Sequence, residues 1–192
     1  ILSDLATQFD KNGESQKALA VWRSLLKWNP QARLKDVALL RLGAAAAHNG
    51  EPQKAISFFE RFEMECGKSA LLPEMLLSRA RMHFKNNDEP HLTGDLNRIA
   101  AAKSAPIRVK AEALLGLGEL KIRKEEYENA IIYFQRAYVT CIASHEHAAR
   151  AYERCAFAFE KINKADAAAQ LYSELLNHPD LADTDAAKEC RS

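Results

Sequence analysis

The chain has 192 residues, with 27 basic and 26 acidic side chains and a formal net charge of +1 at pH 7. This balance gives no overall attraction for phosphates or anionic lipid, which needs an excess of Lys and Arg, so we expect no nucleic-acid partner. The 33 Ala and 23 Leu against 4 Val, 9 Ile and 4 Thr exclude a sheet protein and favour helices. No apolar run approaches the roughly 18 to 20 residues of a spanning helix, and we expect no direct membrane insertion by this segment.

A sequence pattern recurs about every 37 residues along the chain. Gly-Glu-Ser-Gln-Lys-Ala ending at Ala18 is followed by Gly-Glu-Pro-Gln-Lys-Ala ending at Ala55, and the same position returns at spacings of 37, 37, 38 and 38. The five marker residues are Ala18, Ala55, Leu92, Ala130 and Ala168. The spacing predicts one array over 1–192 with units at approximately 1–35, 36–70, 71–105, 106–145 and 146–182, followed by a truncated sixth helix at 183–192.

Each unit is expected to fold as two antiparallel helices. Two helices approach closely only where the side chains at their crossing are small, and a bulky side chain one turn away can fill the adjacent space. Twelve residues before each marker stands a small residue: Ala6, Gly43, Ala80, Gly118 or Ala156. Four residues after each marker stands a large one: Trp22, Phe59, Leu96, Phe134 or Tyr172.

The turn inside each predicted hairpin has its own signal, five residues before the marker. A helix that ends there needs a residue that tolerates left-handed dihedral angles. The residues at this position are Gly13, Gly50, Asn87, Glu125 and Asn163. Prolines agree with this division, because Pro52 and Pro90 fall at the start of second helices. Asn29-Pro30, Ala105-Pro106 and His178-Pro179 separate the units.

These small, aromatic and proline positions resemble the tetratricopeptide repeat over essentially the whole chain. The resemblance implies an all-α fold, a right-handed superhelix of about five antiparallel helical hairpins, and a function in protein–protein interaction. The third unit departs from the pattern. Leu92 replaces the expected Ala, Arg79 stands at a normally apolar place, and His83 stands where the family usually has Tyr or Phe.

The repeat length and the segment 20–30 also look like a bacterial envelope subfamily, which includes outer-membrane assembly lipoproteins and Tol-associated periplasmic coordinators. That narrower resemblance implies a periplasmic or envelope location. The chain starts at Ile1 without a Met, and the period places the end inside a sixth hairpin, so we expect an excerpt of a longer array. An unpaired apolar face is then expected at the C-terminal end, at Leu171, Leu175 and Leu176.

The first helix of each unit is predicted to line a concave groove that binds a partner. Leu40, Leu77 and Leu115 occupy equivalent places and form an apolar stripe. The stripe either binds an apolar helix or extended peptide whose carboxylates the flanking arginines anchor, or it packs neighbouring helices beneath a solvated charged face. The predicted groove residues are Leu40, Ala44, His48, Leu77, Arg81, Phe84, Leu115, Glu119, Ile122, Arg123, Arg150, Arg154 and Phe157.

Two functions are compatible with this pattern. The first is a non-catalytic scaffold that holds a protein or peptide segment in the groove. The second is a regulatory or assembly module of a larger multidomain protein, which contacts neighbouring domains or another copy of itself as a homo-oligomer. No nucleophile motif, Gly-rich phosphate loop or paired-His metal helix is present, so we expect neither an enzyme nor a cofactor.

The cysteines are expected to be free thiols, because helical hairpins of this size need no disulfides and no Cys-x-x-Cys motif is present. Cys141 with His145 and His147 could place a thiolate and an imidazole on one helix face. A closed zinc site needs four ligands, so we do not predict a metal site there.

Overall fold

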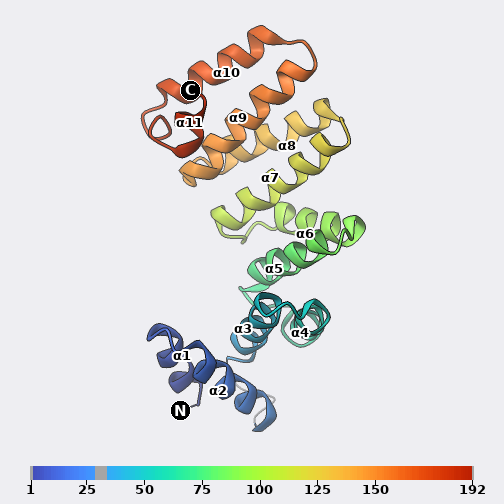
Figure 1. Cartoon of the computed structure of the whole chain (residues 1–192), viewed down its shortest axis with the longest axis vertical. Coiled ribbons are helices and arrows are strands. Elements are labelled where there is room, and N and C mark those ends of the chain that lie inside the picture. Colours follow the sequence, from blue (N-terminus) through green and yellow to red (C-terminus); the bar gives the residue numbers. More distant parts are fainter. Residues whose placement is uncertain (1, 29–33, 192) are drawn as a thin grey trace. The chain divides into compact units, whose positions relative to one another are not determined.

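A computed structural model of the protein describes residues 2–28 and 34–191, and its regular secondary structure over these ranges is entirely helical (Figure 1). The all-α fold class is therefore confirmed. The expected break at Asn29-Pro30 lies outside the described residues. The helices are α1 (Leu2–Lys11), α2 (Ser15–Trp28), α3 (Lys35–His48), α4 (Pro52–Cys66), α5 (Leu72–Lys85), α6 (Glu89–Ala101), α7 (Ile107–Arg123), α8 (Tyr127–Thr140), α9 (His145–Lys161), α10 (Ala165–Asn177) and α11 (Asp185–Glu189).

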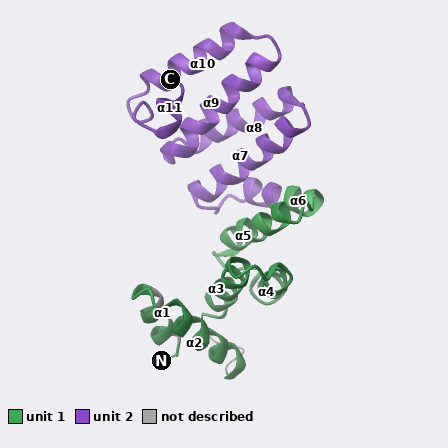
Figure 2. Cartoon of the chain, viewed as in Figure 1, with its two compact units in different colours: residues 1–95 green, residues 96–192 purple. Residues whose placement is uncertain are grey.

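The chain forms two compact units, residues 1–95 and residues 96–192 (Figure 2). In the first unit α1 packs on α2, α2 on α3, α3 on α4, and α4 on α5. In the second unit α7 packs on α8, α8 on α9, α9 on α10, and α11 on α9. Successive helices thus pack on each other from α1 to α5 in the first unit and from α7 to α10 in the second, as expected for stacked hairpins. Within the described ranges no helix has the length and apolar character needed to cross a bilayer.

The hairpin turns have the conformation that their sequence predicts. All five turn residues have positive φ, from 55° at Asn87 to 76° at Gly13. Glu125 adopts this conformation at 58° without being Gly or Asn, and the amide of the next residue, Glu126, donates to the carbonyl of Lys121 at 2.9 Å. The same carbonyl also accepts from the amide of Lys124 at 3.1 Å, and these bonds close the end of α7, which offsets the cost of the left-handed residue.

Small residues at the helix crossings allow the aromatic residues to be buried. Phe59 and Phe134 are both fully buried, and each ring lies against a glycine of the preceding helix. A Cβ added to Gly118 would come within 2.6 Å of Cζ and 2.8 Å of Cδ1 of Phe134. Gly43 is in the same relation to Phe59. The predicted small-to-large contact is therefore confirmed at these two crossings.

The C-terminal end differs from its prediction. Leu175 is fully buried and Leu171 is 7% exposed, so the expected unpaired apolar face is wrong for these two residues. Leu175 belongs to a buried cluster with Leu181 and Ala187, and Leu176 packs partly buried against it. The short helix α11 and the segment before it therefore cover the end of α9 and α10.

Candidate functional site

A groove with a volume of about 810 Å³ lies among α7, α9 and α11 of the second unit. Helices α7 and α9 contribute their faces because they are the first helices of successive hairpins and contact each other. Helix α11 closes one side by packing on α9. The lining residues are Glu112, Leu115, Gly116, Glu119, Glu146, His147, Arg150, Glu153, Arg154, Asp185, Ala186 and Glu189.

The groove is acidic. Six of its lining residues are Asp or Glu, whereas two are Arg. The sequence predicted an apolar stripe flanked by arginines, and the structure differs because Glu112, Glu146 and the acidic residues of α11 also line this groove. Crowded carboxylates give the groove a negative electrostatic potential.

Arg154 is already held by its own chain. Its Nε and Nη2 donate to the two carboxylate oxygens of Glu119, on α7, at 2.6 and 2.9 Å. Its guanidinium also lies over the ring of Phe157, 4.7 Å from the ring centroid. The hydrogen bond to Glu119 raises the pKa of Arg154. A bidentate pair of this kind joins the two helices, so Arg154 is engaged in holding the groove wall.

Glu153 lies beside this pair in a less favourable position. Burial raises the pKa of its carboxyl, and the positive charges of Arg154 and Arg150 only partly offset this. The side chain is 28% exposed and its Oε1 is 4.0 Å from Nη1 of Arg154. A carboxylate that is costly to ionise in the free protein gains from a cation placed in the groove.

The groove brings together four residues of the predicted set, Leu115, Glu119, Arg150 and Arg154. Leu115 is only 7% exposed, so most of its side chain packs within the fold. The groove lining does not include the remaining second-unit residues of that set, Ile122, Arg123 and Phe157. Their part in binding stays a prediction.

In the first unit the apolar stripe is largely covered. Leu77 is 7% exposed and Leu40 is half-buried, which favours the packing interpretation of the stripe for these residues. Ala44, His48 and Arg81 are exposed, and Phe84 is 47% exposed. These four residues remain accessible, and a role for them in binding stays a prediction.

Sequence reasoning missed most of the acidic lining. A signal was present, because Glu146 stands four residues before Arg150 and Glu112 three residues before Leu115, and such spacings place residues on one helix face. Glu189 and Asp185 carried no such signal. Their place depends on how α11 packs on α9, which is a tertiary contact.

One departure of the third unit, Arg79, forms a buried charge network. Nε and Nη2 of Arg79 donate to the two carboxylate oxygens of Asp95 at 2.8 and 2.7 Å, and Nη1 donates to Glu63 at 2.6 Å. Asp95 is 4% exposed. The hydrogen bond to Asp95 is the main reason that the pKa of Arg79 rises. A buried carboxylate requires such a partner, so Arg79 at a normally apolar place is explained by Asp95.

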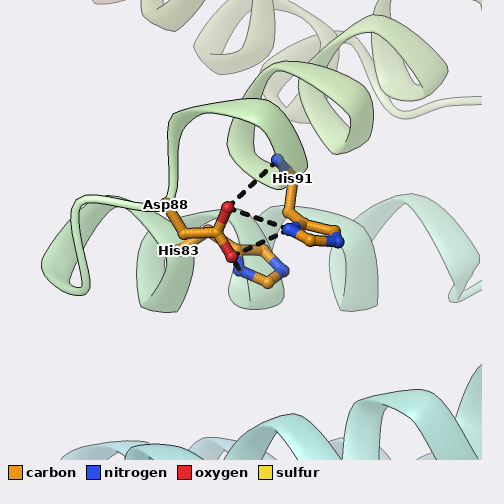
Figure 3. A group of neighbouring side chains, drawn as sticks. All are labelled: His83, Asp88 and His91. Atoms are coloured by element: carbon orange, nitrogen blue, oxygen red, sulfur yellow. Dashed lines mark hydrogen bonds and ion pairs between the residues drawn. The ribbon is translucent and has the colours of Figure 1, made fainter.

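His83 belongs to a second polar cluster next to this network. The cluster consists of His83, Asp88 and His91, at the turn between α5 and α6 (Figure 3). It is the one group of three or more His, Cys, Asp or Glu side chains, among the residues that the structure describes, whose ligand atoms all lie within 4.8 Å of one another. The hydrogen bond from His91 is the main reason that the pKa of Asp88 is lowered.

The region of Cys141 and the following histidines shows no such grouping. Cys141 is 1% exposed at the end of α8, and its sulfur lies 3.5 Å from Oγ1 of Thr140. Nδ1 of His147 lies 2.9 Å from the hydroxyl of Ser144. Cys66, Cys141, Cys155 and Cys190 are all free thiols in the structure.

The pattern of hairpins, turns and crossings is that of a tetratricopeptide repeat protein, and comparison with known families agrees. A tetratricopeptide-repeat family model matches residues 3–70 and 96–144, more than half of the chain. The chain therefore belongs to the tetratricopeptide repeat family. The unmatched stretch 71–95 contains Arg79, His83 and Leu92, the residues at which the third unit departs from the pattern.

Solved structures share this fold at low sequence identity. A MamA protein has a TM-score of 0.69 and 22% identity, over 92% of this chain and 88% of that chain. MamA of Desulfovibrio magneticus RS-1 has a TM-score of 0.66 and 17% identity, over 90% of each chain. BtubC of P. vanneervenii has a TM-score of 0.68 and 18% identity, over 99% of this chain and 78% of that chain. No curated protein sequence matches this chain.

The comparisons do not support the narrower resemblance to the envelope subfamily. Its basis was the repeat length and one segment. Repeat length changes easily, because longer surface loops cost little free energy.

Proposed function

We propose that the protein is a non-catalytic scaffold that binds a basic segment of a partner protein in the groove of its second unit. Membership of the tetratricopeptide repeat family supports the general role, because such repeats are typical of protein–protein interaction scaffolds. The observation that carries the finer proposal is the acidic groove itself, with six carboxylates around a volume of about 810 Å³.

The charge of the groove indicates the kind of segment. The guanidinium of Arg154 is neutralised by Glu119, which leaves an excess of carboxylates to face a ligand. Glu146 is exposed at the start of α9, and the side chain of Asp185 is 86% exposed at the start of α11. Lys or Arg side chains of an incoming segment can reach both positions and pair with them.

Charge reversal at Glu146 tests this proposal. Glu146→Lys should weaken the binding of a labelled Lys- and Arg-containing peptide, measured by fluorescence anisotropy, by at least about tenfold, because one attraction becomes a repulsion. Glu128→Lys is the matched control. Glu128 is also an exposed acidic residue in the first turn of its helix, α8, but it does not line the groove.

The proposal predicts that Glu146→Lys binds the basic peptide more weakly than Glu128→Lys does. Affinity should also fall as salt is added, since the groove acts through charge. Equal binding by wild type, Glu146→Lys and Glu128→Lys would contradict the proposed groove. Preference of the wild type for a matched acidic peptide would contradict the proposed charge of the partner.

The alternative of an assembly module makes a different prediction. If the groove accepts another copy of the chain, the sedimentation coefficient should rise with protein concentration, and Glu146→Lys should abolish that rise. A constant monomer mass across concentrations would leave a separate partner as the occupant of the groove.

A further inference from the structure

The hairpin of α5 and α6 holds a side-chain cluster that the groove does not use. His83 lies in the last turn of α5, Asp88 directly precedes α6, and His91 lies in the first turn of α6 (Figure 3). The turn reverses the chain between the two helices, so residues from both meet at one point. Their potential ligand atoms all lie within 4.8 Å of one another.

Both imidazoles present the same kind of atom to the carboxylate. Nδ1 of His91 is 2.8 Å from each carboxylate oxygen of Asp88, and Nδ1 of His83 is 3.2 Å from Oδ2. The two rings are stacked, with centroids 5.1 Å apart and an interplanar angle of 21°. Ligand atoms around a tetrahedral zinc ion are about 3.4 Å apart. To hold the ion, the ligand atoms would have to move from their present positions within 4.8 Å of one another, and the two rings would have to turn out of their stacked arrangement.

The contacts within the protein do not explain why Nδ1 of His83 is buried. His83 is 7% exposed, and its Nδ1 is shielded from solvent and makes no hydrogen bond with any described residue. Its other nitrogen, Nε2, faces the carboxylate of Asp95 at 3.9 Å. Nδ1 points at Asp88 and His91 without forming a hydrogen bond, although Oδ2 of Asp88 is 3.2 Å away, and with the proton on Nε2 its lone pair would be available to a metal ion.

The remaining contacts in the cluster do not account for this lone pair. Asp88 accepts a hydrogen bond from the backbone amide of His91 at 3.4 Å, as a residue at the start of a helix commonly does. That contact and the ion pair with His91 would suffice to explain Asp88 and His91. Neither uses Nδ1 of His83, which is buried and aimed at the same carboxylate.

We propose that His83, Asp88 and His91 bind one divalent transition-metal ion, with zinc as the best match. Two imidazole nitrogens and one carboxylate oxygen suit zinc, and water can complete a tetrahedral shell. The side chain of His91 is 73% exposed, so the ion and the water have access from solvent. Asp95 faces the non-ligating nitrogen of His83 as an outer carboxylate, and Arg79 holds Asp95 in place.

The ion would join the two helices of one hairpin. It would connect the end of α5 with the start of α6 next to Leu92, the large residue at the place where the other units have Ala. A metal cross-link stabilises the folded hairpin, since the unfolded chain does not hold the three ligands together.

The experiment is a calorimetric titration of the chelator-treated, full-length chain with zinc chloride. Cobalt(II) chloride then serves as a probe whose visible spectrum distinguishes four-coordinate from six-coordinate binding. Three variants each remove one ligand and preserve the local structure. His83→Phe keeps a buried planar ring, Asp88→Asn keeps a residue that can cap α6, and His91→Ala changes an exposed side chain.

A histidine outside the cluster provides the matched control. His145 is exposed at the start of α9, so His145→Ala removes an imidazole without touching the cluster. We expect one zinc ion per chain in the wild type and in His145→Ala, with a four-coordinate cobalt spectrum and a rise in melting temperature on adding zinc. Each cluster variant should weaken zinc binding by at least about tenfold and lose the rise in melting temperature.

Two outcomes would overturn the proposal. One is a wild-type chain that binds no zinc at one ion per chain. The other is zinc binding of unchanged affinity in His83→Phe and His91→Ala, which would place the ion elsewhere in the molecule.

Discussion

Gly118→Ala adds one methyl group at the crossing of α7 and α8. The new Cβ would lie 2.6 Å from Cζ and 2.8 Å from Cδ1 of Phe134. Such contacts are shorter than carbon atoms tolerate, so the ring or the helix must move. Phe134 is fully buried, and its ring has no solvent-exposed position to move into.

The net effect is the difference between two opposing contributions. Ala is favoured over Gly in a helix interior by about 1 kcal/mol. Forcing an extra methyl into a packed core costs about 1–3 kcal/mol, and an overlap with three atoms of one buried ring places this change near the upper end. We therefore expect Gly118→Ala to lower the free energy of unfolding by about 1–2 kcal/mol.

Urea unfolding followed by far-ultraviolet circular dichroism measures this difference. Gly94→Ala is the control, because Gly94 lies inside α6 and an added Cβ there meets nothing within 4 Å. That variant should be more stable than the wild type by about 1 kcal/mol, which is the helix preference alone. If Gly118→Ala were as stable as Gly94→Ala, close packing at the crossing would not be the reason for a glycine at position 118.

Three further predictions follow from the polar and titratable side chains. Arg79→Met should lower the free energy of unfolding by about 3–5 kcal/mol in thermal unfolding, because the buried Asp95 loses its partner, and adding Asp95→Asn should recover part of the loss. Glu153→Gln should be more stable than the wild type at pH 7. Burial raises the pKa of Glu153 in the folded state, so the wild type loses stability relative to the variant as pH rises above the unfolded-state pKa of the carboxyl. The difference in their free energies of unfolding should disappear below about pH 4, where the carboxyl is protonated in both the folded and the unfolded state. Cys155 should not react with a thiol reagent at pH 8 in the folded protein, because it is fully buried and burial raises its pKa to about 12, whereas the half-buried Cys66 should react.

Each of these predictions has a contradicting result. A stable Arg79→Met protein would mean that Asp95 finds another partner or is protonated. Glu153→Gln that is less stable than the wild type at pH 7 would show that the nearby arginines outweigh burial. Fast labelling of Cys155 without denaturant would show that α9 opens readily, and full labelling in urea is the positive control.

The helical hairpins could be predicted because their signals are local. Gly13, Gly50 and Asn87 predict turns because Gly and Asn tolerate left-handed dihedral angles, and all three residues have the predicted positive φ. The crossing of Gly118 with Phe134 was also readable, since repetition at a constant spacing shows which residues must face each other. The same small and large positions recur in five units, so their contact can be inferred from the repetition.

The candidate sites could be predicted only in part. Arg150 and Arg154 are two of the predicted residues that line the groove of the second unit, but its acidic character was not predicted because Asp185 and Glu189 reach it through the packing of α11 on α9. Likewise, His83, Asp88 and His91 have no spacing that marks a metal site in a sequence. They meet because a turn ends one helix and starts the next.

The sequence by itself determined the class of this protein: helices in pairs, turns at constant positions, and small residues opposite large ones. Periodicity and backbone preference act over a few residues, so a single chain is enough to read them. Only the tertiary structure decided which charges face one another. Arg79 departs from the repeat pattern in sequence, and in the structure its guanidinium pairs with the buried Asp95; Arg154 is a predicted groove residue, and in the structure Glu119 holds it. Charge pairing acts through space, and the distance between two charges is a property of the fold.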